Sequence, residues 1–71
     1  MSARPRFREM VEMTIKIVAN EGEISIARLA FMLNVSPSVA SYILRAAAEL
    51  DSRILYVRGR ALWQDGDARN G

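Results

Sequence analysis

The sequence predicts a mainly α-helical domain in which three helices are followed by a small β-hairpin. Apolar residues recur every three or four positions over most of residues 7–50, which is the periodicity of helices. A β-branched and aromatic run with one glycine in its middle follows, which indicates two short strands. The chain has 71 residues, so we expect one domain that buries only about 60% of its unfolded surface and is marginally stable.

The first helix is expected over residues 5–20. Pro5 suits the first turn of a helix, where its missing N–H costs nothing. Gly22 suits the position after the last turn as a C-terminal cap. The inward face is the set of residues at i, i+3 and i+4 spacing: Phe7, Met10, Val11, Thr14, Ile15 and Val18.

A second helix is expected to begin after Ser25, whose hydroxyl can cap it, with residues 23–25 forming one β-bridge before it. Its inward residues are expected to be Ile26, Leu29, Ala30 and Leu33. Asn34 is the best non-glycine residue for a left-handed turn, so it should end this helix.

The third helix is expected over residues 37–50, because Ser36 can cap it and Pro37 can occupy its first position. Its expected inward residues are Ala40, Ile43, Leu44, Ala47 and Leu50.

The β-hairpin is expected over residues 54–63, after an exit turn at Asp51-Ser52. Arg58-Gly59-Arg60 would be its turn, and Tyr56 and Trp63 would pack beneath it. The folded domain is therefore residues 5–63, with a flexible N-terminus at 1–4 and a disordered tail at 64–71.

The chain contains no cysteine and no histidine, which excludes disulfides, structural zinc and nucleophiles of the Cys–His or Ser–His type. The body is too small to enclose a substrate, so we expect no enzymatic activity, cofactor or metal. The longest stretch without a charge, residues 29–44, contains several polar residues and is no membrane span. With no signal peptide either, we expect a cytoplasmic protein.

The charges are distributed unevenly, although the net charge is only +2. Residues 9–23 carry four glutamates and one lysine, whereas residues 51–63 carry three arginines and one aspartate. This polarity suits a domain whose second half meets a polyanion, but an ordinary solvated surface accounts for it equally well.

The segment Ile26–Arg45, placed in this order of elements, resembles winged helix-turn-helix DNA-binding domains. Leu29-Ala30, Leu33-Asn34-Val35-Ser36 and Ala40 with Leu44 match the family pattern, and the resemblance extends from about Phe7 to Trp63. It implies a three-helix winged helix-turn-helix fold that binds double-stranded DNA, with helix 37–50 in the major groove and hairpin 54–63 on the backbone. Some winged helices bind proteins instead.

The candidate DNA-binding residues lie on the outward side of the third helix and at the hairpin turn. Serine hydroxyls and Tyr42 can bind phosphate, and Arg45 can bind guanine or phosphate. The alternatives are that the serines form only a cap and a solvated face, and that the turn arginines serve solubility. The full set is Ser36, Ser38, Ser41, Tyr42, Arg45, Arg58 and Arg60. Arg4, Arg6 and Arg8 form either a basic arm or a solubilising terminus.

An apolar surplus departs from the family pattern. Phe31 and Met32 replace residues that are usually polar, and Met10, Met13 and Ile17 form a second apolar stripe on the first helix. We expect these five residues to form a homodimer or partner interface, unless the small domain buries them itself.

The expected function is therefore that of a small, nucleoid-associated transcription regulator that binds double-stranded DNA as a homodimer. The alternative is a protein-interaction winged helix that acts as an accessory subunit of a replication or transcription complex.

Overall fold

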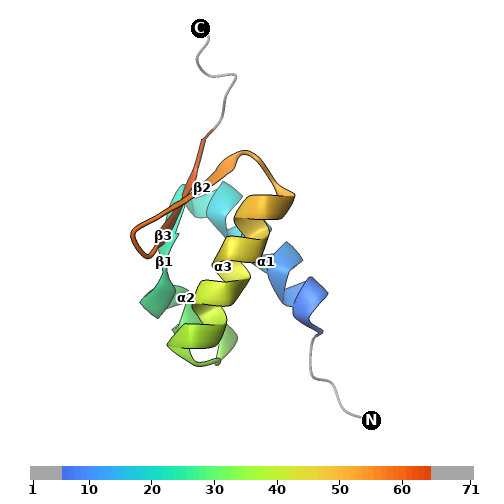
Figure 1. The fold of residues 1–71 in the computed structure, drawn as a ribbon, viewed down its shortest axis with the longest axis vertical. Helices are drawn as coiled ribbons and strands as arrows, with labels where there is room; N and C mark the ends of the chain where they lie inside the picture. Colours follow the sequence, from blue (N-terminus) through green and yellow to red (C-terminus); the bar gives the residue numbers. More distant parts are fainter. Residues whose placement is uncertain (1–5, 65–71) are drawn as a thin grey trace, which may run out of the picture.

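Three helices and a three-stranded antiparallel sheet make up residues 6–64, the part of the chain that the computed structural model describes (Figure 1). The predicted fold class, mainly helical with a small hairpin, is confirmed. The predicted flexible N-terminus, 1–4, and the predicted tail apart from Gln64 lie outside the described residues. The elements are α1 (Phe7–Glu21), β1 (Glu23–Ser25), α2 (Ile26–Leu33), α3 (Pro37–Leu50), β2 (Ile54–Val57) and β3 (Arg60–Trp63).

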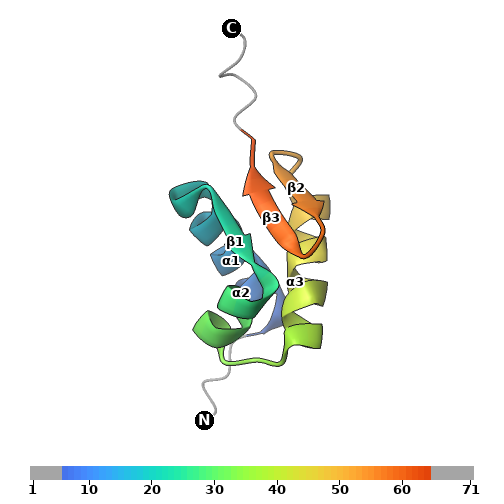
Figure 2. The ribbon, with the colours of Figure 1, turned by 90° about the vertical axis from the view of Figure 1, so that its left-hand side faces the viewer.

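The sheet has β3 at its centre, with β1 and β2 on either side (Figure 2). The sequence predicted one β-bridge at residues 23–25, but β1 pairs with β3 over its whole length, from Glu23 opposite Leu62 to Ser25 opposite Arg60. β3 begins one residue earlier than expected, because Arg60 pairs with Val57. The hairpin loop is therefore Arg58 and Gly59 alone, and we call these two residues the hairpin tip.

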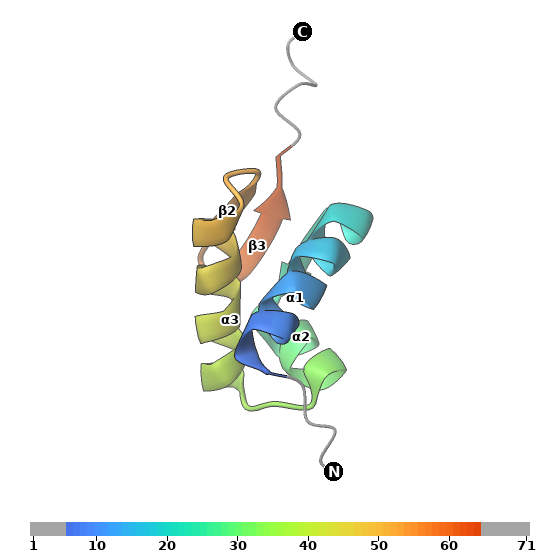
Figure 3. The same ribbon diagram turned by 90° about the vertical axis from the view of Figure 1, so that its right-hand side faces the viewer.

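α3 packs against both other helices and against β2, so it lines one whole side of the molecule (Figure 3). Its inward side chains are small or medium in size, which lets α1 and α2 approach closely. Thr14 is the buried polar residue of the core, and its hydroxyl donates to the Met10 carbonyl at 2.8 Å. The buried apolar core is Val11, Val18, Ile24, Leu29, Ala30, Ala40, Ile43, Leu44, Ala47, Ile54 and Ala61.

The caps predicted at Gly22, Ser25, Asn34 and Ser36 are confirmed. The predicted start of the first helix at Pro5 is not: α1 begins at Phe7 with Arg6 as its N-cap, and Pro5 lies outside the described residues. The Ser25 hydroxyl accepts the Arg28 backbone N–H at 3.2 Å, and the Ser36 hydroxyl accepts that of Val39 at 3.3 Å. Asn34 closes α2 in the left-handed region with φ of 58°, and Gly22 closes α1 with φ of 89°. These caps satisfy backbone groups that a helix end leaves without partners.

Leu50 is the clearest error of the predicted core, because 66% of it is exposed. Leu50 lies in the last turn of α3. The first turns of α1 lie beside it but do not cover its side chain. Leu50 lines a depression together with Phe7 and Val11. Phe7 was also expected to face inward, but it is 40% exposed. Tyr56 and Trp63 pack against the core as predicted.

The exit from α3 is held by Asp51 and Arg53. The Asp51 carboxylate accepts two hydrogen bonds from the Arg53 side chain, at 3.1 and 3.0 Å, and one from its backbone N–H at 3.0 Å. These side-chain and backbone bonds lower the pKa of Asp51. The Arg53 guanidinium also lies 4.7 Å from the centre of the Trp63 ring, so one side chain connects the end of α3 to β3.

Within residues 6–64, no single helix is long and apolar enough to cross a membrane, and α2 with α3 meets that test only as a pair bent by 105°.

Replacing two leucines of α3 by alanine tests this packing. Leu44 is fully buried, so we expect Leu44→Ala to lower the free energy of unfolding by about 2–5 kcal/mol. Leu50 is mostly exposed, so Leu50→Ala should change it by less than about 1 kcal/mol. Chemical denaturation followed by circular dichroism measures both variants. If both variants lost the same free energy of unfolding, the orientation of α3, with Leu44 facing the core and Leu50 facing the solvent, would be contradicted.

Candidate nucleic-acid interface

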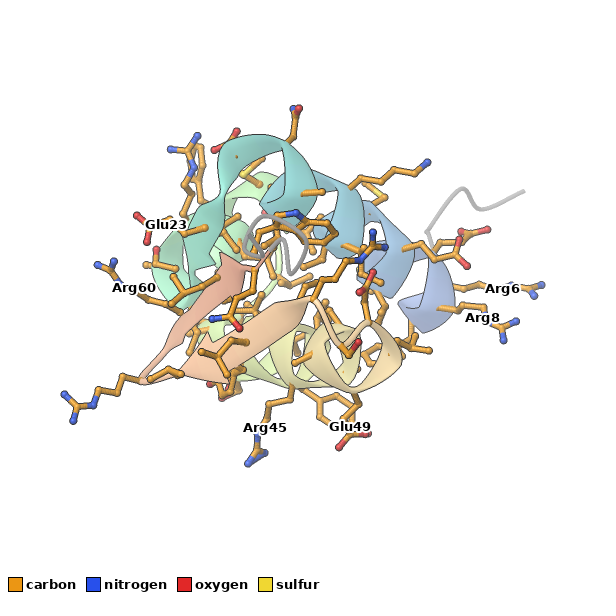
Figure 4. The ribbon with its side chains drawn as sticks, turned by 90° about the horizontal axis from the view of Figure 1, so that it is seen from above. Arg6, Arg8, Glu23, Arg45, Glu49 and Arg60 are labelled. Atoms are coloured by element: carbon orange, nitrogen blue, oxygen red, sulfur yellow. The ribbon has the colours of Figure 1, made fainter. Side chains whose placement is uncertain are left out.

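The outward side of α3 carries four exposed residues in one line. Ser38, Tyr42, Arg45 and Glu49 are separated by four, three and four positions, so they share one helix face. The buried residues of α3 lie on the opposite face. Arg45 and Glu49 project from α3 in the same direction, away from the body of the molecule (Figure 4). We call these four residues the outward stripe.

Two of the predicted serines have local partners. The Ser36 hydroxyl is exposed and serves as the cap of α3, as described above. Ser41 is partly buried and its hydroxyl lies 3.2 Å from that of Tyr56 on β2. Ser41 is therefore on the flank of α3 that faces the sheet, whereas Ser38 is exposed on the outward stripe.

Tyr42 is the aromatic residue of the outward stripe, and 62% of it is exposed. Its ring centre lies 5.2 Å from that of Phe7, with a tilt of 33° between the ring planes. This contact with the first residue of α1 orients the tyrosine ring while most of the side chain stays accessible. Sequence reasoning missed Phe7 because it expected that residue in the core.

The predicted arginines fall into two groups. Arg45 and Arg58 are exposed, and neither forms an ion pair with any residue in 6–64. Arg60 contacts Glu23 at 3.3 Å across the β1–β3 pair. The side chains of Arg60 and Glu23 project on a different side of the molecule from Arg45 (Figure 4). The structure therefore separates Arg60 from the outward stripe.

The partners of Arg60 belong to a cluster beside β1. Arg28 and Glu21 form a second pair there, at 3.7 Å. Glu21, Glu23, Arg28 and Arg60 line one shallow depression, so the two arginines are balanced by two carboxylates. Arg6 and Arg8 project from the start of α1, on the side opposite to Arg60 (Figure 4), and Arg4 lies outside the described residues.

The hairpin tip has an unusual backbone. Arg58 and Gly59 both have positive φ, at 48° and 78°, as a two-residue type I′ turn requires. Glycine adopts this conformation freely, but for arginine it costs about 1 kcal/mol. The Gly59 carbonyl accepts the Ile26 N–H at 3.0 Å, which fastens the tip to the start of α2. The hairpin is thus short and fixed in position.

Glu49 is the charged residue that sequence reasoning missed. It follows Arg45 by four positions, and that spacing could have revealed that the two share one face. With Tyr42, Ala46, Ala48 and Tyr56, the two charged residues line a depression between α3 and β2.

The predicted interface residues are divided between surface and core. Phe31 is 85% exposed, and Met13 and Met32 are 45% and 41% exposed. Met10 and Ile17 are partly buried and pack against the core, as the alternative interpretation expected. An exposed phenylalanine of this extent is the strongest apolar feature of the described surface.

No protein-family model, curated protein or solved structure matches this chain. Among residues 6–64, no three side chains of the metal-ligating types are grouped so that they could hold a metal ion.

Arg58→Asn tests the backbone of the hairpin tip. Asparagine before glycine is the preferred pair of a type I′ turn, so we expect this variant to be more stable by about 0.5–1 kcal/mol. Arg60→Asn is the matched control, because Arg60 pairs within β3 and has no positive φ. Thermal melting compares the two. A lower melting temperature for Arg58→Asn would contradict the turn geometry.

Proposed function

We propose that this chain binds double-stranded DNA and acts as a small transcription regulator, with α3 in the major groove and the hairpin on the backbone. The single observation that supports this most is the outward stripe. A helix that enters the major groove needs an accessible face with short side chains toward its N-terminus. α3 offers Ser36 and Ser38 at its start and Arg45 about two turns further along, all of them exposed.

The hairpin supplies the proposed backbone contact. Arg58 is exposed at its tip and has no ion-pair partner in the described part of the chain. A guanidinium held this way suits a phosphate oxygen. Arg60 is less suited, because Glu23 already neutralises it. Among the turn arginines we therefore assign the phosphate contact to Arg58.

The proposal includes a homodimer of the chain. Phe31 is 85% exposed, and Met13 and Met32 are 45% and 41% exposed; on a small domain, an exposed apolar patch marks a partner surface. A homodimer that covers this surface would present two copies of α3 to half-sites about one helical turn apart. The same residues support the second candidate function, a protein-interaction subunit of a replication or transcription complex.

Duplex binding is tested by titrating a labelled random-sequence duplex at two salt concentrations. If a dimer neutralises about four to six phosphates, the logarithm of the association constant should fall with the logarithm of salt concentration with a slope of about −4 to −5. Arg45→Ala should reduce discrimination between sequences by about tenfold, and Arg58→Ala should weaken binding to all sequences alike.

Arg28→Ala serves as the matched control for this titration. It removes the same charge from the cluster beside β1, where Glu21 already pairs with Arg28, so we expect little change in affinity. Wild-type protein that binds no duplex even at low salt would reject the proposed function. In that case a stoichiometric protein partner would support the second candidate.

The homodimer is tested by sedimentation equilibrium at micromolar concentration. We expect a species of twice the 8.0 kDa chain mass. Phe31→Ser should shift the equilibrium toward monomer, because it removes the largest exposed apolar side chain. Leu50→Ser, which removes an exposed apolar side chain from α3 instead, should leave it unchanged. A wild-type monomer of 8.0 kDa would overturn the dimer.

A further inference from the structure

The proposed DNA-binding face carries a carboxylate that needs an explanation. Glu49 is exposed on the outward stripe, and DNA phosphates would repel it. No arginine or lysine in residues 6–64 forms an ion pair with it. An arginine that precedes a glutamate by four positions is also the weaker order for a helical pair. The described part of the chain therefore does not neutralise Glu49.

The side chains of Arg45 and Glu49 face the same region of the surface. Both side chains project in one direction from α3 (Figure 4), and both line the depression between α3 and β2. Ala46 and Ala48 also line the depression and add no charge to it. A ligand that enters this depression meets a strong donor and a strong acceptor about 6 Å apart along the helix axis.

Base edges in the major groove offer chemistry that matches this pair. A carboxylate only accepts hydrogen bonds, so it can bind the N4 amino group of cytosine or the N6 amino group of adenine. Adenine places its N7 acceptor beside that amino group and would repel the second carboxylate oxygen, whereas cytosine has no such acceptor. Arginine binds the O6 and N7 acceptors of guanine.

We propose that α3 reads a guanine with Arg45 and a cytosine with Glu49, one or two base pairs apart. The spacing follows from the distance of about 6 Å between the two positions and a base-pair rise of about 3.4 Å. This inference rests on the proposed function. Under this proposal, Glu49 lowers the affinity for DNA in general. The affinity is restored only at sites where a base amino group faces Glu49, so Glu49 acts as a specificity residue.

Selection of bound duplexes from a random pool tests the inference, with wild type, Glu49→Gln and Glu12→Gln compared at one salt concentration. The wild type should enrich a guanine and a cytosine within two base pairs. Glu49→Gln should keep the guanine and replace the cytosine by adenine, because a carboxamide both donates and accepts and so fits N6 and N7. We expect a change of about tenfold in the relative enrichment of these two bases.

Glu12→Gln is the matched control, because it removes one exposed carboxylate from α1 and leaves α3 intact. It should select the same bases as the wild type, and thermal melts should show that both variants are folded. A Glu49→Gln variant that loses the cytosine and keeps the guanine supports the inference, whether or not adenine takes its place. Any other pattern in a protein that binds duplexes overturns the inference and leaves the proposed function standing. A wild type that binds no duplex overturns both.

Discussion

The structure depends on the way α3 is buried along one face only. Its inward residues are small enough for α1, α2 and β2 to pack against the same helix, and Ala40, Ile43, Leu44 and Ala47 are fully buried there. Among residues 6–64, α1, α2 and the sheet all pack on that inward side, and the residues on the opposite face of α3 stay exposed. The exposed stripe of α3 therefore follows from how these elements pack as well as from its polar residues.

The second constraint is the antiparallel pairing of β1 with β3. It joins the segment between the first two helices to the end of the domain, and the bond from Ile26 to Gly59 fixes the hairpin tip at the start of α2. A hairpin held this closely gains stability but loses reach, because its loop consists of Arg58 and Gly59 alone and glycine has no side chain. In the proposed function, its contact with the DNA backbone would therefore be shallow, and α3 would recognise the sequence.

Local chemistry explains why so much of the fold could be predicted from the sequence. Ser25, Ser36 and Asn34 act on backbone groups within four residues, so their roles as caps and turn do not depend on distant packing. Tertiary packing decided the positions that were predicted wrongly or incompletely. Leu50 has the spacing of a core residue, but the sequence of α3 does not indicate which part of α3 is covered by α1.

The candidate site was harder to predict for the same reason. Nothing in the sequence around Ser41 indicates that Tyr56 will lie opposite its hydroxyl, because the two residues are brought together by the turn at Asp51. Likewise Arg60 is one position away from the hairpin tip, and only the register of β1 against β3 places it beside Glu23. The spacing of residues along α3 was enough to group Ser38, Tyr42 and Arg45. The same spacing also includes Glu49, although a carboxylate was not expected on this face.

The charge pairing links the two parts of the proposed function. On α3 and the hairpin, Arg45 and Arg58 are the basic residues without ion-pair partners in the described chain, since Glu23 takes Arg60. Two cations release about two counterions, which supports only weak binding at physiological salt. In the proposed function, a homodimer would double that number and add a second reading helix. The exposed Phe31 and the two arginines of α3 and the hairpin that have no ion-pair partner in residues 6–64 therefore support the same proposal, in which a second copy strengthens binding to DNA.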